Sequence, residues 1–485
     1  MNFKKTSISD LHKKYINKEA NVKDVIKNVI DNISKEKDKN FLITFTDKEA
    51  LNISENIMIE KNKFLSGIPY VNKDNVSTKG VLTTAGSKLL KDYVPPYDAT
   101  ITELLKKQQA IQIGKSALDE LGMGGTGLFS FNGIVKNPID EKRIIGGSSS
   151  GSAYSVCKGL VPFAIGTDTG DSIRKPASYA GIYGYKPTYG SISRYGVIPY
   201  APSLDHVGFF TNFAEDLVYL ADVFIKYDKK DSTSINNEKD YLKVLEKKVQ
   251  KNKFVFIKQV WDYLSENLKE AYLKLFDILK KDGHIVEMVS FNKNLLDAIP
   301  AMYMMISFAE GVSTSSNLDG INFGFRQEGN DYEDIIKKTR TYSFGDTVKR
   351  RFLLGSYQLR KENQELLLAK SKKVRRLVVE ELNKIYEDCD ILILPPSLKE
   401  APLINEVYGT DIEERYDGDS AFLQDLLILA NLNGMPSITL PFIKDNKTNM
   451  PIGININSKP FTDDNLLSIT IYLEKIIKSN FNKEN

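Results

Sequence analysis

Two small-residue turns that contain serines are the parts of this sequence best suited to covalent chemistry. Residues 146–152 read G-G-S-S-S-G-S and lead into an apolar helical pattern, and residues 166–172 read G-T-D-T-G-D-S after a predicted strand. Consecutive small residues after a strand expose backbone N–H groups, which a site for an oxyanion requires. Ser172, at the end of the second turn, is therefore a candidate nucleophile, provided that a base lies near it.

The source of that base is open from the residues alone. None of the three histidines, His12, His206 and His284, lies near Ser172 in the sequence, so a Ser-His-Asp arrangement has little support. Lys73 is the other option, because it ends a predicted strand in the segment G-I-P-Y-V-N-K-D-N. Taken singly, however, a lysine at a strand end is usually solvated, and a glycine–serine run is typical of a flexible turn with a helix N-cap.

Composition and spacing exclude several other kinds of site. The two cysteines, Cys157 and Cys389, cannot form a disulfide framework or a Cys-rich zinc site. Gly114-Lys115-Ser116 is not a phosphate loop, because that motif needs glycine where this chain has Gln109. With 66 basic and 63 acidic side chains the net charge is +3, which argues against a dedicated nucleic-acid binder.

The elements that must position these residues alternate between strand and helix patterns. Short apolar, β-branched runs predict strands at residues 41–45, 68–71, 111–113, 163–166, 254–257, 285–289, 391–394 and 438–440. Helical spacing predicts helices at about 9–35, 101–109, 215–224, 266–281, 349–386 (broken near Gly355) and 465–477. Such alternation predicts a mixed or mostly parallel sheet that is covered by helices on both faces.

The chain shows no sign of secretion or of a membrane span in its sequence pattern. Its first residues contain lysines but no apolar segment of signal-peptide type, and its apolar runs fall short of about 20 residues. We therefore expect a cytoplasmic protein. We also expect a single domain over residues 1–485, with a helical segment at about 1–40 and a core at about 41–480 that contains a helical insertion at about 300–390.

Taken together, the segments around Lys73, Ser148 and Ser172 resemble the amidase signature family. That family combines a lysine in G-I-P-x-x-x-K-D with G-G-S-S-G-G-S and then D-T-G-G-S-I-R-x-P, and here the two serines are 24 residues apart. The resemblance runs from about residue 9 to the C-terminus and includes residues 119–124, 137–138, 184–190, 434–438 and 451–453. It implies the amidase signature α/β fold, a large mixed, mostly parallel β-sheet sandwiched between α-helices.

Within the family, the chain resembles the members that hydrolyse glutamine for a tRNA-dependent amidotransferase. Residues 186–196, 203–205, 315–321 and 348–351 carry this similarity. It implies that Tyr303, Arg351 and Asp425 hold glutamine, with Arg350 as the alternative to Arg351, and we add Met123 to this substrate-binding set. The chemistry suits glutamine, because arginine pairs bidentately with a carboxylate and aspartate pairs with an ammonium group.

The resemblance also implies a reaction for the serines. Ser172 attacks the side-chain amide of glutamine and forms an acyl-enzyme, while Ser148 relays protons between Ser172, neutral Lys73 and the leaving ammonia. The backbone N–H groups of Thr169, Gly170 and Asp171, together with that of Ser172, hold the oxyanion.

The implied partners supply the rest of the activity. Ammonia passes to a B subunit, which converts Glu-tRNA(Gln) to Gln-tRNA(Gln); conversion of Asp-tRNA(Asn) is left open. A small C subunit helps to assemble a heterotrimer, and tRNA is contacted mainly through the B subunit. We expect no cofactor in this chain and place ATP and Mg²⁺ in the partner, because the sequence has no phosphate loop.

Two residues depart from the family pattern, since Ser150 and Asp171 each replace a glycine. The Asp171 carboxylate would oppose developing negative charge unless it is turned away or paired, and we expect Arg174 as its partner. This departure motivates one alternative, a non-catalytic assembly component whose site has decayed. The other alternative is a free-standing amidase that acts on other small amides.

The implied base, Lys73, must be neutral to accept a proton. Its pKa would have to fall from about 10.4 to about 7–8, and burial away from any carboxylate could achieve this. Asp74 follows directly, but alternation along the strand should send its side chain to the opposite face.

Overall fold

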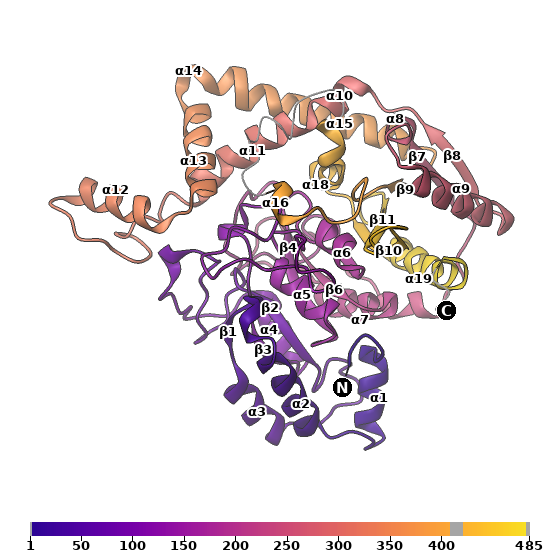
Figure 1. Cartoon of the computed structure of the whole chain (residues 1–485), viewed down its shortest axis with the longest axis horizontal. Helices are drawn as coiled ribbons and strands as arrows, with labels where there is room; N and C mark the ends of the chain where they lie inside the picture. Colours follow the sequence, from indigo (N-terminus) through magenta and orange to yellow (C-terminus); the bar gives the residue numbers. More distant parts are fainter. Residues whose placement is uncertain (1, 408–420, 482–485) are drawn as a thin grey trace.

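An eleven-stranded sheet runs through the centre of the computed structural model, which describes residues 2–407 and 421–481 (Figure 1). The strand order is β1-β3-β2-β4-β6-β5-β10-β11-β9-β7-β8. The strands are β1 (Leu42–Phe45), β2 (Pro69–Lys73), β3 (Ile111–Ser116), β4 (Phe163–Asp168), β5 (Tyr183–Lys186), β6 (His206–Thr211), β7 (Lys253–Ile257), β8 (Ile285–Val289), β9 (Ile391–Leu394), β10 (Ser437–Lys444) and β11 (Pro451–Ser458).

The sheet is mixed, as predicted, but it is not mostly parallel. Of the ten pairings between the described strands, six are antiparallel and four are parallel. The difference comes from three strands that the sequence patterns did not predict, β5, β6 and β11, whose described pairings are all antiparallel. Glycines interrupt each of them, and β11 alternates isoleucine with the buried polar residues Asn455 and Asn457.

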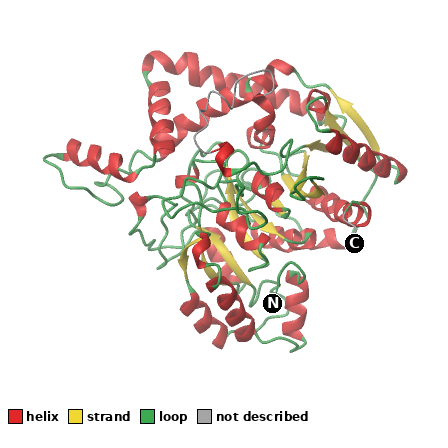
Figure 2. Cartoon of the chain, viewed as in Figure 1, coloured by secondary structure: helices red, strands yellow, loops and turns green. Residues whose placement is uncertain are grey.

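Helices flank the sheet and extend beyond it (Figures 1 and 2). The α-helices are α1 (Ile8–Ile16), α2 (Val22–Ser34), α3 (Asp47–Asn56), α4 (Thr100–Lys107), α5 (Ser150–Cys157), α6 (Arg174–Ala180), α7 (Ala214–Phe224), α8 (Lys258–Trp261), α9 (Glu266–Lys281), α10 (Lys293–Asp297), α11 (Ile299–Thr314), α12 (Tyr332–Ser343), α13 (Asp346–Leu359), α14 (Lys361–Gln364), α15 (Lys370–Ile385), α16 (Ile404–Val407), α18 (Leu429–Asn433) and α19 (Asp463–Asn480).

Opposite faces of the sheet pack against different helices. Phe209 of β6 packs against Phe224 of α7 with the two rings tilted and their centroids 5.4 Å apart. Its neighbour Phe210 points to the other face, where it lies near Gly166 together with Ile173, at the start of α6. This follows from the two-residue period of a strand, which sends successive side chains to opposite faces. The helices therefore enclose the sheet, as the sequence pattern predicts.

Two of the predicted helical stretches are divided differently in the structure. The pattern at 9–35 is two helices, because α1 ends at Ile16 and Asn21 caps a second helix through its bond to the Asp24 N–H. The helical pattern at 349–386 is broken, as predicted, but the break lies at Arg360, after α13 ends at Leu359, and not near Gly355. A Cβ at Gly355 would overlap the carbonyl oxygen of Phe308 in α11, so this glycine permits close packing of two helices instead of ending one.

One helical stretch, Lys293–Thr314, is long and apolar enough to cross a membrane by length and composition. It consists of α10 and α11, and half of its most apolar window is buried inside the protein. α11 packs against α13 and α15, so other helices of the protein cover part of its apolar surface. All the elements between Ile299 and Ile385 are helices, and Figure 1 shows α12 lying away from the sheet.

The sheet brings the predicted catalytic residues Lys73, Ser148 and Ser172 to one edge. Strands β2 and β4 are parallel neighbours, with Tyr70 opposite Phe163, so their carboxyl ends lie at the same edge. Lys73 is the last residue of β2, and the turn that carries Ser172 follows β4. Ser148 lies just before α5, which packs on both strands.

Candidate active site

Lys73 lies fully buried among hydroxyl groups. Its Nζ is 2.9 Å from Ser148 Oγ, 2.8 Å from Ser149 Oγ and 2.8 Å from Thr167 Oγ1. Ser149 Oγ donates to the Thr167 carbonyl at 3.0 Å, and Asn75 donates to Thr167 Oγ1 at 3.1 Å. Because the Ser149 proton is already used, Lys73 must donate to that oxygen. The lone pair of a neutral Lys73 amine is then available to accept the Ser148 proton.

The surroundings of Lys73 favour its neutral form. Burial lowers the pKa of Lys73 to about 7, against the opposing charges of Asp119, Asp168 and Asp205. We expected no carboxylate near Lys73, and this is wrong, because the charges of these three aspartates reach it. None of the three forms an ion pair with Lys73. The adjacent Asp74 does point to the opposite face, as predicted, where it lies 3.6 Å from Lys115 Nζ.

Backbone hydrogen bonds join the segments that carry Ser148 and Ser172. The Ser149 N–H donates to the Ser172 carbonyl at 3.3 Å, which places the two turns side by side. The Asp119 N–H donates to the Ser148 carbonyl at 3.2 Å. Both serine side chains are nearly fully buried, with 2% of Ser148 and 3% of Ser172 exposed. The two serines and Lys73 thus belong to one water-poor region.

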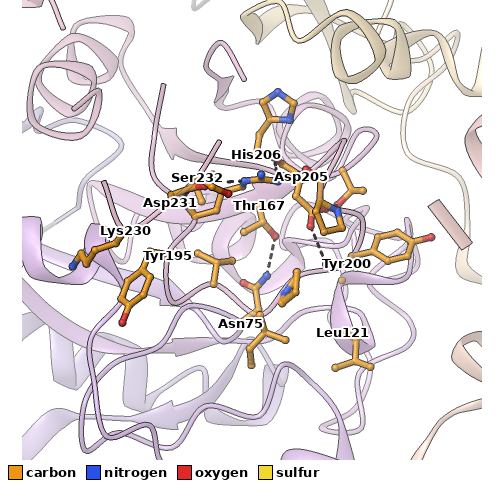
Figure 3. A pocket seen from close by; sticks show the side chains of 18 residues that line it. Asn75, Leu121, Thr167, Tyr195, Tyr200, Asp205, His206, Lys230, Asp231 and Ser232 are labelled. Atoms are coloured by element: carbon orange, nitrogen blue, oxygen red, sulfur yellow. Dashed lines mark hydrogen bonds and ion pairs between the residues drawn. The ribbon is translucent and has the colours of Figure 1, made fainter. Parts of the chain in front are cut away.

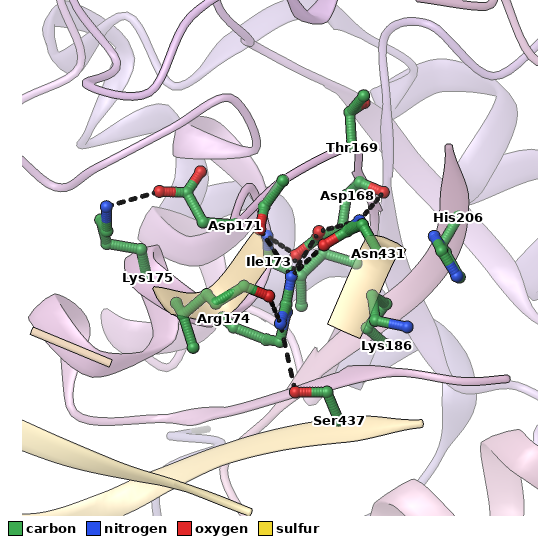
Figure 4. Close-up of polar contacts among 12 residues, drawn as sticks. Asp168, Thr169, Asp171, Ile173, Arg174, Lys175, Lys186, His206, Asn431 and Ser437 are labelled. Atoms are coloured by element: carbon green, nitrogen blue, oxygen red, sulfur yellow. Dashed lines mark hydrogen bonds and ion pairs between the residues drawn. The ribbon is translucent and has the colours of Figure 1, made fainter. Parts of the chain in front are cut away.

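A buried ion pair shapes the turn before Ser172 (Figure 4). The Arg174 guanidinium contacts both Asp168 carboxylate oxygens, at 2.9 and 3.1 Å, and Asn431 donates to the same carboxylate at 3.0 Å. Burial alone would raise the pKa of Asp168, but the Arg174 charge and these hydrogen bonds hold it well below its usual range. The Ile173 N–H also donates to Asp168, so the chain between residues 168 and 173 closes on itself.

The same arginine orients a backbone amide that could bind an oxyanion. Arg174 donates to the Gly170 carbonyl at 2.7 Å. Because a trans peptide is planar, the Asp171 N–H of that peptide points away from Arg174. Within the described part of the chain, no hydrogen-bond acceptor faces the N–H groups of Gly170, Asp171 or Ser172. These donors are therefore available to a substrate oxygen.

The predicted partner of Asp171 is wrong. Asp171 pairs with Lys175, with a distance of 2.7 Å between the carboxylate and the ammonium group, and not with Arg174 (Figure 4). The physical reason is helical geometry, because residues four apart lie on the same side of the chain entering α6, whereas Arg174 turns inward to Asp168. The Lys175 charge compensates the carboxylate that replaces a glycine here.

A cavity of about 470 Å³ opens beside this turn. Its wall includes Gly170 and Asp171 together with three residues from the predicted substrate set, Tyr303, Arg351 and Asp425. Tyr303 of α11 leans over the turn so closely that a Cβ at Gly170 would lie 3.0 Å from its hydroxyl oxygen. A guanidinium group and a carboxylate in one wall match a ligand that carries both an ammonium and a carboxylate.

The structure separates the two arginines that the sequence left as alternatives. Arg351 lines the cavity, whereas Arg350 is exposed on the outside of α13. Arg351 donates to the Tyr200 hydroxyl at 2.9 Å and lies over the rings of Tyr200 and Phe308. Met123 is fully buried and does not line this cavity among the described residues, although Gly124 and Gly125 after it do.

A second cavity, of about 270 Å³, reaches the Thr167 side of the site (Figure 3). Asn75, Thr167 and His206 lie in its wall, and the buried Asn75 Oδ1 and His206 Nε2 have no hydrogen-bond partner within the described chain. Asp205 borders the same cavity and accepts a hydrogen bond of 2.7 Å from the Thr169 hydroxyl. Asp205 therefore supports the turn before Ser172 from this side.

Sequence reasoning missed several residues that build this site. Ser149 and Thr167 contact Lys73, yet in the sequence they are ordinary members of the two small-residue turns. The roles of Asn431 and Tyr200 depend on contacts between segments more than 100 residues apart, for which a single sequence gives no signal. Asp205 could have been noticed within the Ser203–Asp205 segment, though not its bond to Thr169.

Comparison with known proteins shows which family and fold this chain resembles. A family model described as Amidase matches residues 24–467. The A subunit of glutamyl-tRNA(Gln) amidotransferase from Mycoplasma pneumoniae is 37% identical over 484 residues, which is 98% of this chain and 99% of that protein. The corresponding protein of Pediococcus pentosaceus is 35% identical, with 96% of this chain and 95% of that protein covered.

Solved structures agree with these relatives. The A subunit of glutamyl-tRNA(Gln) amidotransferase from Thermotoga maritima superposes with a TM-score of 0.79 at 31% identity, covering 98% of this chain and 95% of that chain. A peptide amidase from Stenotrophomonas maltophilia superposes with a TM-score of 0.83 at 20% identity, covering 98% and 97% of the two chains. At that identity the second comparison supports the fold alone.

Proposed function

The chain belongs to the amidase family, and we propose that it is the glutamine-hydrolysing subunit of a tRNA-dependent amidotransferase. The observation that carries this proposal is the cavity beside Gly170, where Arg351 and Asp425 offer opposite charges to one small ligand. Arg351 would bind the α-carboxylate of glutamine and Asp425 its α-ammonium group. This arrangement would present the side-chain amide to the turn that carries Ser172.

Acylation begins when Ser172 Oγ attacks the carbon of the glutamine side-chain amide. Ser148 takes the Ser172 proton while it gives its own to the neutral Lys73 amine, which lies 2.9 Å away. The backbone N–H groups of residues 169–172 stabilise the oxyanion. The carbon–nitrogen bond then breaks, the proton returns through Ser148 to the leaving nitrogen, and ammonia departs from a glutamyl ester on Ser172.

Deacylation uses water and the same groups. Lys73, neutral again, accepts a proton from the attacking water through Ser148, and the ester bond to Ser172 breaks. Glutamate leaves and the Ser172 hydroxyl is restored. Because both half-reactions depend on a neutral lysine, the burial that lowers the pKa of Lys73 to about 7 supports this assignment.

The ammonia would be consumed outside this chain. The relatives are each named as one subunit of an amidotransferase, so they belong to assemblies of more than one polypeptide. We assign conversion of Glu-tRNA(Gln) to Gln-tRNA(Gln), the binding of ATP and Mg²⁺, and most tRNA contacts to a B subunit. A small C subunit would complete a cytoplasmic heterotrimer.

A Ser172→Ala variant of the assembled complex tests the proposal. We expect loss of glutamine hydrolysis and of glutamine-dependent amidation, because no other hydroxyl forms the ester. Amidation of Glu-tRNA(Gln) with added ammonium chloride should continue, since that step belongs to the partner. Substantial glutamine hydrolysis by Ser172→Ala would contradict the nucleophile. A wild-type chain that hydrolyses other small amides but not glutamine would contradict the substrate.

A further inference from the structure

The helix that carries Arg351 begins against a carboxylate from the catalytic region. α13 starts after Gly345, which supplies no side-chain cap of its own. Instead, the Gly345 N–H donates to Glu120 Oε2 at 2.8 Å. The other oxygen of this buried carboxylate, Oε1, accepts a hydrogen bond of 2.5 Å from Ser87 Oγ. Negative charge at the start of a helix is favourable, because the first N–H groups of a helix lack acceptors within it.

Glu120 also follows directly after Asp119, whose backbone is bonded to the segment that carries Ser148. The neighbouring Asp119 donates its N–H to the Ser148 carbonyl, and its carboxylate accepts from the N–H groups of Thr126 and Gly127. The short turn Glu120–Gly122 is therefore held rigidly to the segment that carries Ser148. Through Glu120, the same turn is bonded to the start of α13.

Arg351 lies between two fixed points of its helix. It follows Gly345 by six residues, or about 9 Å along the helix axis. Beyond it, Gly355 packs against the Phe308 carbonyl of α11 so closely that no side chain fits there. A weaker contact at Gly345 would leave the first turns of α13, which carry Arg351, without one of the two contacts that fix the helix.

We propose that Glu120 is a positioning residue for substrate binding, which ties the start of α13 to the Ser148 segment and thereby places Arg351 in the glutamine cavity. This inference rests on the proposed function, because it assumes that Arg351 binds the substrate carboxylate. It predicts that Glu120 governs the KM for glutamine more than kcat, since Glu120 does not line the substrate cavity among the described residues.

The charge of Glu120 can change near neutral pH. Burial raises its pKa to about 7, against the hydrogen bonds from Ser87 and Gly345 and the charges of Lys349 and Lys88. These are the charged groups that act on it from α13 and from the turn Lys88–Leu90, and Asp346 on α13 lies 3.6 Å from Lys349. A cleft of about 340 Å³ lined by Glu120, Lys88 and Asp346 gives the carboxyl group a path to solvent.

The test compares Glu120→Gln with Asp346→Asn in the full-length chain with its partner subunits. Glutamine keeps the shape of Glu120 and can still accept from Gly345, so the variant tests charge and not packing. We expect its KM for glutamine to rise about fivefold, because a charge-assisted hydrogen bond becomes a neutral one, while kcat stays within about twofold. Asp346→Asn removes an exposed acid from the same helix start and should leave both values unchanged.

A pH series distinguishes positioning from a general loss of structure. The wild-type KM should rise as the pH falls from 8 to 6 and Glu120 takes up a proton, whereas the KM of Glu120→Gln should stay high and flat. An unchanged KM in Glu120→Gln, or a variant that keeps the wild-type pH dependence, would overturn the inference. Absence of glutamine hydrolysis in the wild type would instead contradict the proposed function.

Discussion

Substitution of Lys73 by arginine, combined with a pH profile of the wild type, gives a quantitative test of the base. The pKa of Lys73 falls from its ordinary value of 10.5 to about 7 because the side chain is fully buried. That change corresponds to about 5 kcal/mol in favour of the neutral amine. At pH 7.5 an ordinary lysine is neutral in only about 0.1% of molecules, whereas Lys73 is neutral in roughly three quarters of them.

The sign of the pH effect follows from the protonation of a base. The neutral fraction of Lys73 is about 9% at pH 6 and about 91% at pH 8, so kcat at saturating glutamine should rise about tenfold between these values and then level off. Lys73→Arg should be nearly inactive at every pH, because a guanidinium cannot give up its proton. Measuring kcat at saturation separates this effect from any change in glutamine affinity.

The control for Lys73→Arg is Lys158→Arg, at the end of α5. Lys158 is partly exposed and pairs with Glu36 at 3.2 Å, an interaction that arginine can keep. We expect this variant to retain wild-type kcat and the wild-type pH profile. Circular dichroism of Lys73→Arg should show a folded chain. An active Lys73→Arg enzyme, or a wild-type kcat that is flat from pH 6 to 8, would refute Lys73 as the base.

Two further predictions concern the glutamine cavity. Arg351→Lys should raise the KM for glutamine about tenfold with a smaller effect on kcat, because a point charge replaces a bidentate fork, while Arg350→Lys should change neither value; steady-state kinetics that show the reverse would exchange the two roles. Gly170→Ala should raise KM severalfold, since its Cβ would lie 3.0 Å from the Tyr303 hydroxyl and 3.3 Å from Ile428; wild-type kinetics in this variant would show that Tyr303 does not need its place over the turn.

Local patterns in the sequence predicted much of the secondary structure. The helix at 266–281 and the strand at 391–394 have their predicted bounds. The helix has a clear helical period between Ser265 and Asp282, and the strand is a continuous apolar run between Asp390 and Pro395. Strands β5, β6 and β11 were missed, since glycine and buried asparagine break the apolar pattern that identifies a strand. The sheet therefore has more antiparallel pairs than the sequence suggested.

The two serine-containing turns were recognisable from residues near each other in sequence, whereas the roles of Lys73 and Ser148 came from the resemblance to the amidase signature family. The turns with Ser148 and Ser172 and the strand that ends at Lys73 were all identified, and the fold places them at one sheet edge. The partner of Asp171 was not, because pairing depends on which side chain turns inward, and Arg174 is drawn to Asp168 instead. Both pairs are local in sequence, so the choice between them depends on the direction that each side chain takes in the folded chain.

The most direct test of the account is to trap the acyl-enzyme and locate it. The full-length chain with its partner subunits would be mixed with glutamine, quenched in acid within one turnover, digested and examined by mass spectrometry. The account predicts a γ-glutamyl ester on Ser172, no ester on Ser148, and no ester at all in Ser172→Ala or in Lys73→Arg. An ester on Ser148, or glutamine turnover without an ester on Ser172, would contradict the central claim that Ser172 is the nucleophile and Lys73 its base.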